Sequence, residues 1–171
     1  MTIIGSSFII RPVRPDELDW VLEVYRQCED FLALGPVPLA SMEMVLSDLQ
    51  ISKEAGGIFC GIFKNDGEMI GVLDYIPQNF EGNPGSAFIE LLMIAAPHRR
   101  KGLGKEILQL VEKEIMQNPR IQDILSGVQV NNPGAIEFWQ KAGYLIISGP
   151  ILWEDGTTVY RLSKHLSGQH S

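Results

Sequence analysis

Cysteine is scarce in this chain. Two cysteines, Cys28 and Cys60, occur among 171 residues, without C-x-x-C spacing. They are too few for a disulfide framework, so the sequence predicts a protein of a reducing compartment, and we expect the cytoplasm. The three histidines lack the spacing of a metal site, so no metal is expected. The chain has no run of about 18 apolar residues, so we expect no membrane association.

Positive charge is also in short supply. The chain has 14 lysine and arginine residues against 21 aspartate and glutamate residues, and its formal net charge at pH 7 is -7. Such a protein is not expected to bind nucleic acid, because phosphate backbones require a basic surface. The acidic balance mildly favours a cationic substrate.

Linkers and internal repeats are absent as well. No Pro-, Gly- or Ser-rich stretch separates two hydrophobic blocks, and the apolar content of 45% is sufficient for one sizeable core. We therefore expect a single domain over residues 1–171. Its core should span about residues 8–163, followed by a loose tail at residues 164–171.

The chain does contain a basic, glycine-containing segment after a strand-like run. Residues Ala87–Ile94 are apolar except for one carboxylate, which is typical of a strand buried on both faces. Four cations and two glycines follow within one segment, namely Arg99, Arg100, Lys101, Gly102, Leu103, Gly104 and Lys105. This arrangement predicts a loop that leads from a buried strand into a helix.

The helix after this loop is predicted by its apolar spacing. One helical stripe contains Leu103, Ile107, Leu110, Val111 and Ile115. The positions left for solvent are Lys105, Glu106, Glu112 and Lys113.

Gly102 and Gly104 allow positive φ and a close approach to a ligand, so successive N–H groups at the helix N-terminus can point at an anion. The neighbouring cations favour phosphate. The segment is not a Walker A motif, because GxxxxGK[ST] is absent, and it lacks the third glycine of a dinucleotide fingerprint. A solvated run of charges at a helix start is the alternative.

Two segments together resemble one family. Residues Arg99–Gly104 resemble the acetyl-CoA signature R/Q-x-x-G-x-G/A of the GNAT superfamily of N-acetyltransferases. Residues Asn132–Tyr144 resemble its N-x-x-A-x-x-x-Y-x-x-x-G-F stretch. The positions in register are Asn132, Ala135, Gly143 and Tyr144. The resemblance spans roughly residues 8–163.

The resemblance implies an α+β fold, an α/β sandwich with a mixed, largely antiparallel sheet of about six to seven strands flanked by about four helices. It also implies a splay between the strands that end near Ile94 and Val130. Local patterns agree with this fold. They predict a helix over residues 16–31, a second one marked by Met42 to Leu49, a hairpin over residues 57–76, and strands near residues 144–148 and 157–162.

The resemblance further implies acetyl-CoA as cosubstrate. In the family, the pantetheine arm lies along the strand and the pyrophosphate lies on the loop amides. The residues assigned to this site are Leu92, Met93, Ile94, Arg99, Arg100, Lys101, Gly102, Leu103, Gly104, Lys105, Asn132, Phe138 and Trp139. Asn132 is equally expected to be the N-cap of the helix that follows it.

Glu90 is the candidate general base. An acceptor amine with a pKa of about 10.4 is almost fully protonated at pH 7, so a base would assist acetyl transfer. Glu90 is the lone ionisable residue in its apolar strand, and burial raises the pKa of a carboxyl group toward the useful range. The alternative is a Glu90 that pairs with a cation or faces solvent at the edge of the sheet.

Trp139 departs from the family pattern, in which a tyrosine commonly serves as the acid toward the departing thiolate. An indole N–H does not release a proton, so Trp139 is expected to pack against the pantetheine arm. Tyr144 is our candidate acid, with Tyr75 and Tyr160 as others, unless the thiolate leaves unaided.

The predicted function is N-acetyl transfer to a primary amine of a small molecule or peptide. The segments Phe31–Pro38 and Gln78–Gly85 are expected to line the acceptor site. Carboxylates that could attract the amine, or be merely solvated, are Glu29, Asp30, Asp74 and Glu81. One alternative is a catalytically weak CoA-binding sensor module, and another is a protein-interaction or nucleotide-binding domain whose basic loop meets ATP or another phosphate. The resemblance also implies that a homodimer could form.

Overall fold

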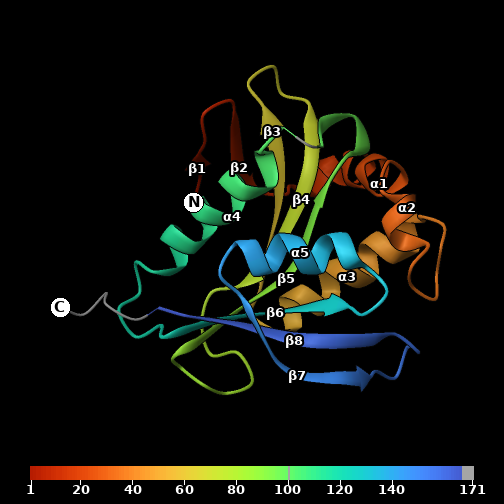
Figure 1. Ribbon diagram of the computed structural model, residues 1–171. Coiled ribbons are helices and arrows are strands. Elements are labelled where there is room, and N and C mark those ends of the chain that lie inside the picture. The colour runs from red at the N-terminus through yellow and green to blue at the C-terminus, as the bar shows by residue number, and fades with distance from the viewer. Residues whose placement is uncertain (100, 167–171) are drawn as a thin grey trace.

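The computed structural model describes residues 1–99 and 101–166. In this part of the chain, eight strands form a sheet in the order β1-β2-β3-β4-β5-β6-β8-β7, with helices on both faces (Figure 1). The strands are β1 (Ile3–Ile4), β2 (Phe8–Pro12), β3 (Ile58–Lys64), β4 (Met69–Ile76), β5 (Ser86–Ile94), β6 (Asp123–Gln129), β7 (Leu145–Leu152) and β8 (Thr158–His165). The helices are α1 (Leu18–Arg26), α2 (Glu29–Leu32), α3 (Met42–Glu54), α4 (Leu103–Ile115) and α5 (Pro133–Lys141). Within the described residues, no helix combines the length and apolar character needed to cross a membrane.

The expected α+β sandwich with a mixed sheet is confirmed. Neighbouring strands are antiparallel, apart from the parallel pair β5 and β6. The expected hairpin is formed by β3 and β4, which turn through Asn65–Gly67, where Gly67 has a φ of +93°. The helix expected over residues 16–31 is divided into α1 and α2 by a turn at Gln27 and Cys28, and Cys28 is buried at this turn.

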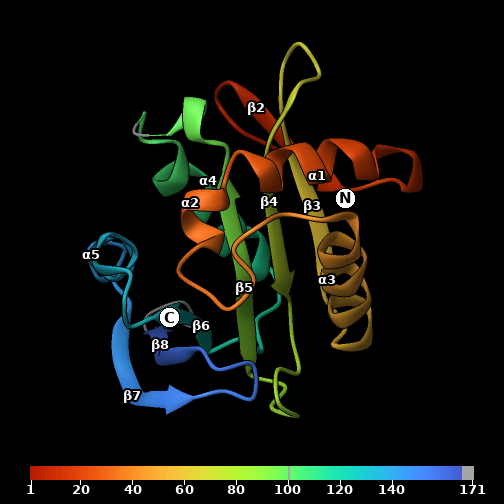
Figure 2. The ribbon, with the colours of Figure 1, turned by 90° about the vertical axis from the view of Figure 1, so that its right-hand side faces the viewer.

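The sheet separates two hydrophobic clusters. On one face, α4 and α5 pack through side chains such as Ile107 and Trp139. On the other face, α1 and α3 pack through Val21 and Val45. Figure 2 shows the two pairs of helices on opposite sides of the sheet.

One expectation for α4 is wrong. The apolar spacing predicts that Glu112 faces solvent, but only 6% of it is exposed. Its carboxylate accepts hydrogen bonds from the Tyr144 hydroxyl at 2.8 Å and from Nζ of Lys164 at 3.1 Å. A buried carboxylate requires such partners, and both come from parts of the chain that follow α4 by many residues.

The expected core limits of residues 8 and 163 are too narrow. Ile3 in β1 is buried, and β8 continues to His165, with Leu166 buried after it. The strand continues because residues 164 and 165 still pair with β6. Residues 164–166 of the expected tail therefore belong to the packed structure, whereas residues 167–171 lie outside the described residues.

The splay predicted near Ile94 and Val130 is confirmed. β5 and β6 pair only over Ser86–Ile89 and Asp123–Ser126, and at the last pair the Ser126 hydroxyl donates to the Ile89 carbonyl at 2.8 Å. Beyond that pair the strands separate, because β6 stays with β8 while β5 stays with β4 (Figure 2). This separation positions the candidate site.

Candidate active site

A cleft of about 850 Å³ occupies the splay between β5 and β6. The first turn of α4 and one face of α5 contribute to its lining, as do α2, the loop after α2, and α3. Trp153, Asp155 and Thr157 reach it from the segment between β7 and β8. Its volume lies in the range of pockets that bind small molecules.

The N-terminus of α4 forms an anion cradle in this cleft. Gly102 is the N-cap, with a φ of +73° that favours glycine, and residues 102–105 line the cleft. The helix begins with a hydrogen bond from the Glu106 amide to the Gly102 carbonyl at 3.2 Å, and the amides of residues 103–105 have no partner among the described residues, so they can meet an anion. A Cβ on Gly104 would lie 3.3 Å from Phe138, so glycine keeps this space open.

Arg99 lines the cleft, but its side chain is already engaged. Its Nε donates to the Ile94 carbonyl at 2.7 Å, and its guanidinium forms an ion pair with Asp30, which holds the pKa of that carboxyl below its usual range. The charge of Arg99 is therefore shared with Asp30 in this structure, and its assignment to the cofactor site stays a prediction. Arg99 also ties α2 to the end of β5.

The remaining expected cations differ in position. Lys105 is exposed and lines the cleft. Lys101 is exposed but is not among the described residues that line it, and Arg100 lies outside the described residues. Among the described residues of the cradle, Lys105 is thus the side-chain cation that is best placed to meet a phosphate.

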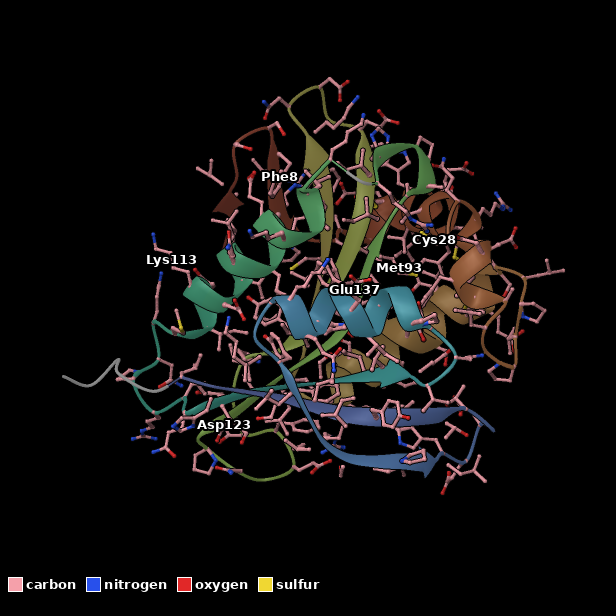
Figure 3. The ribbon with its side chains drawn as sticks, in the orientation of Figure 1. Phe8, Cys28, Met93, Lys113, Asp123 and Glu137 are labelled. Carbon is pink, nitrogen blue, oxygen red and sulfur yellow. The ribbon has the colours of Figure 1, made fainter. Side chains whose placement is uncertain are left out.

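The strand residues assigned to the donor arm separate into two groups. Leu92 and Ile94 line the cleft. The side chain of Met93 instead packs in the cluster with α1, which also contains Cys28; both residues are labelled in Figure 3. Because the pairing of β5 with β6 stops at Ile89, the β6-facing main chain beyond that point has no partner strand.

The N-cap and the second half of α5 supply three of the expected residues. Oδ1 of Asn132 accepts the Ala135 amide at 3.1 Å, so its expected role as N-cap is confirmed, and Asn132 also lines the cleft. Phe138 and Trp139 line it too, with their rings edge to face at a centroid distance of 5.6 Å. The two aromatic rings give this wall an apolar surface.

Glu90 reaches the cleft because of a β-bulge. Asp74 of β4 pairs with Leu91, whereas the next residue, Tyr75, pairs with Ile89, so Glu90 is the extra residue of β5. Glu90 is exposed to solvent within the cleft.

The surroundings of Glu90 suit a base. Its carboxylate has no hydrogen-bond or ion-pair partner among the described residues, which contradicts the alternative of a paired glutamate, whereas its exposure agrees with the other alternative, a glutamate that faces solvent. Partial desolvation by the cleft walls raises its pKa, the nearby carboxylate of Asp48 raises it further, and Arg161 opposes both effects.

The candidate acid Tyr144 does not fit its assigned role. It is fully buried in the core beneath α5, where its ring lies edge to face with Trp139, and it is not among the described residues that line the cleft. Its hydroxyl donates to Glu112, and burial raises its pKa. The position of Tyr144 beneath α5 makes it a core residue.

We expect Tyr144→Phe to lower the free energy of unfolding by about 1–2 kcal/mol, because the buried carboxylate of Glu112 loses one of its two partners. Turnover should stay unchanged. Chemical denaturation and steady-state kinetics on the same preparation check both. A large loss of kcat with normal stability would restore the assignment of Tyr144 as acid.

The other candidate acids are no better placed. Tyr75 is buried, and neither it nor Tyr160 lines the cleft. Among the described cleft-lining residues there is no tyrosine, histidine or cysteine.

The sequence predicts part of the cleft wall opposite α5. The expected segment Phe31–Pro38 contributes to the lining, whereas Gln78–Gly85 contributes none of the described lining residues. The sequence did not predict that Asp48 and Trp153 line the cleft. Asp48 shares a helical face with Met44 and Ser47, but this spacing does not reveal that the face meets the cleft.

Asp74, expected as a carboxylate that could attract an amine, serves a different purpose. It is buried and accepts a hydrogen bond from the Ser52 hydroxyl at 2.6 Å, which joins β4 to α3. Burial raises its pKa to about 7. Asp74 is not among the described residues that line the cleft.

Comparison with known proteins identifies the family of this chain. The profile of the acetyltransferase (GNAT) family matches residues 20–144. Curated proteins contain no significant match to the sequence.

Several solved structures share the fold. An acetyltransferase from Thermus thermophilus superposes with a TM-score of 0.77 and 23% identity, covering 97% of this chain and 100% of the other. A spermidine N-acetyltransferase from Vibrio cholerae, solved with CoA and spermine, has a TM-score of 0.72 and 16% identity, covering 98% and 100%. An acetyltransferase from Salmonella typhimurium that modifies the N-terminal serine of a 50S ribosomal subunit protein has a TM-score of 0.76 and 14% identity, covering 98% and 100%.

Proposed function

The chain belongs to the acetyltransferase (GNAT) family, and from this membership we propose that it transfers the acetyl group of acetyl-CoA directly to a primary amine of a small molecule or peptide. Both substrates are bound together in a ternary complex. The amine nitrogen attacks the thioester carbonyl, and the C–S bond breaks. Of the two protons that the ammonium form loses, one ends on the CoA thiol and one in solvent.

The donor half of the proposal is supported by the cradle and the splay. The amides at the start of α4, together with Lys105, offer hydrogen bonds and positive charge to the pyrophosphate. The edge of β5 that lacks a partner strand offers main-chain groups near Leu92 to the amides of the pantetheine arm, in the manner of an added strand, whereas the Ile94 carbonyl already accepts the Nε of Arg99. Asn132, Phe138 and Trp139 complete the wall along α5.

The part of the proposal that concerns the acceptor amine is supported by the carboxylate of Glu90, which has no partner among the described residues. It lies at a bulge beside the point where the strands separate, and its raised pKa brings it closer to that of the amine proton it would remove. We assign Glu90 as the general base, acting on the ammonium directly or through one water molecule.

We assign protonation of the departing thiolate to solvent. The cleft offers no tyrosine among its described lining residues, and the indole of Trp139 cannot serve as an acid. A thiol with a pKa near the ~8.5 of cysteine is a tolerable leaving group without an acid. Trp139 is proposed to pack against the arm.

Binding and turnover test the proposal together. Calorimetry should give selective binding of acetyl-CoA over ATP, with 3′,5′-ADP as the control for the nucleotide half, and thiol release should depend on an added amine. Binding matched by ATP would contradict the donor site. Selective binding of acetyl-CoA without thiol release for any amine would favour the CoA-binding sensor module.

Two further expectations from the sequence stay predictions, namely a cytoplasmic location and a homodimer. The edge strand β7 is exposed along its whole length and is the surface at which a second copy could add.

A further inference from the structure

The cleft contains more negative charge than that of Glu90 alone. Its described lining includes three carboxylates, namely Asp48 of α3, Glu90 of β5 and Asp155 from the segment between β7 and β8. None of the three forms an ion pair with another described residue. The cations of the described lining are Arg99, which pairs with Asp30, and Lys105, which lies in the cradle at the start of α4. The described lining therefore has no cation left to balance these carboxylates.

Asp48 is a half-buried carboxylate that a neutral donor holds in place. The hydroxyl of the buried Tyr25 in α1 donates to Oδ2 of Asp48 at 2.7 Å. The other oxygen, Oδ1, has no hydrogen-bond partner among the described residues and is not one of their buried atoms, so solvent reaches it. A hydroxyl donor does not neutralise a carboxylate, so Asp48 can still bind a cation that enters the cleft.

Asp48 and Glu90 act on each other electrostatically. Desolvation by the cleft walls raises the pKa of Glu90, and the negative charge of Asp48 raises it further. Two like charges in a partly desolvated cleft repel each other, and a cation bound to both would remove this repulsion. The two carboxylates thus favour a positively charged ligand group at the place where the base acts.

The other charged groups near Glu90 do not fill this place. Arg161 of β8 acts on Glu90 with the opposite sign, but its guanidinium pairs with Glu81 at 3.0 Å. Asp74 of β4 also senses the charge of Glu90, but it is buried and is not among the described lining residues. Asp155 is exposed and is not among the groups that shift the pKa of Glu90. Asp48 is therefore the cleft carboxylate that can share a cation with Glu90.

We propose that Asp48 and Glu90 together bind the acceptor as an alkylammonium ion, with Asp48 holding the charged group and Glu90 taking its proton. This proposal rests on the proposed function and narrows its acceptor to amines that are protonated at pH 7, which excludes weakly basic aromatic amines and alcohols. One N–H bond of the ammonium breaks, and its proton passes to the carboxylate of Glu90. The electron pair stays on the nitrogen, which attacks the thioester carbonyl, and Asp48 keeps its charge throughout.

A charged probe and its neutral counterpart test the role of Asp48 in binding. n-Hexylamine is an ammonium ion at pH 7, whereas 1-hexanol has the same alkyl chain without the charge. In the complex of the protein with CoA, Asp48→Asn should weaken the binding of n-hexylamine at least about tenfold, because a charge-assisted contact is lost. Binding of 1-hexanol should stay unchanged, which also reports an intact cleft. Asparagine can still accept the Tyr25 hydroxyl, so the fold should be retained, and calorimetry measures both affinities.

The matched control removes one negative charge from the same helix. Glu43→Gln changes an exposed residue of α3 outside the described lining. It should leave the affinity for n-hexylamine at the wild-type value, because the contact with the ammonium group is specific to Asp48.

The pKa of Glu90 is a second readout, and it requires no acceptor. Asp48→Asn removes one of the two causes that raise this pKa, so the pKa should fall by about 0.5 unit or more. Carbon NMR of the Glu90 carboxyl, assigned by its absence in Glu90→Gln, measures the pKa in the free protein. Glu43→Gln should keep the wild-type value. With any amine that is acetylated, the acid limb of kcat in Asp48→Asn should move to lower pH, because the base then stays deprotonated to lower pH.

The outcomes separate this proposal from the proposed function. Equal affinity of wild type and Asp48→Asn for n-hexylamine, or no binding of n-hexylamine to the wild-type complex with CoA, would overturn the proposal about Asp48. An unchanged pKa of Glu90 in Asp48→Asn would overturn it as well. In each case, CoA binding and thiol release that depends on an added amine would leave the acetyltransferase standing. Absence of both CoA binding and thiol release would instead remove the proposed function, and this proposal with it.

Discussion

Glu90→Gln should lower kcat about 10²-fold or more, because removal of a positioned general base typically costs about 10²–10⁴-fold. Glutamine keeps the size of the side chain and its place at the bulge of β5, but it cannot accept a proton. The affinity for acetyl-CoA should stay constant, since the donor contacts lie in α4, α5 and the main chain of β5. Steady-state kinetics at saturating amine, with calorimetry of acetyl-CoA, measure the two effects.

The pH dependence of turnover tests the role of Glu90 as general base more directly than the loss of kcat does. A base acts when it is deprotonated, so wild-type turnover should fall as the pH drops through the pKa of Glu90. Because that pKa is raised, the fall should begin at a higher pH than for an ordinary glutamate. Without the base, the rate should follow the free amine and rise about tenfold per pH unit up to the pKa of the amine.

A matched control distinguishes the loss of the general base from the effect of removing one negative charge. Glu43→Gln removes the same charge from an exposed position of α3 outside the described lining, and it should leave kcat and the pH profile unchanged. If Glu90→Gln retains wild-type turnover at every pH, Glu90 is not the base.

Gly104→Glu should lower the affinity for acetyl-CoA at least about 100-fold, which corresponds to about 2.7 kcal/mol. The first atom of the new side chain would already lie 3.3 Å from Phe138 and 3.6 Å from Ile94, so the side chain must project into the cleft. Its carboxylate would then occupy the start of α4, where the proposal places the pyrophosphate, and would repel it. Calorimetric titration with acetyl-CoA measures the loss.

The control for this variant lies on the same helix. Gln109→Glu adds one negative charge at an exposed position of α4 outside the described lining, so affinity should stay near the wild-type value. Circular dichroism of Gly104→Glu must show an intact fold, since the contact with Phe138 requires a small adjustment. Wild-type affinity in a folded Gly104→Glu protein would place the donor elsewhere.

Features that depend on neighbours in the chain were predictable. The hairpin follows from the Asn65–Gly67 turn, and the cap of α5 follows from the place of Asn132 before Pro133. The cradle follows from glycines at the start of an amphipathic helix. Resemblance to the family added the splay, which no local pattern indicates. The prediction that Tyr144 is the acid was wrong, because a position in a motif does not reveal which way the ring points.

The sequence by itself determined the order of elements, the positive-φ glycine at the start of α4 and the lone carboxylate of β5, because each depends on backbone preference and apolar spacing within about two helical turns. The tertiary structure decided the partners of the charged groups. Arg99 meets Asp30 across 69 positions, and Glu112 meets Lys164 across 52. Glu90 is left without a partner among the described residues, where two strands separate. Such pairings depend on which distant surfaces pack together, and local propensity contains no information about that choice.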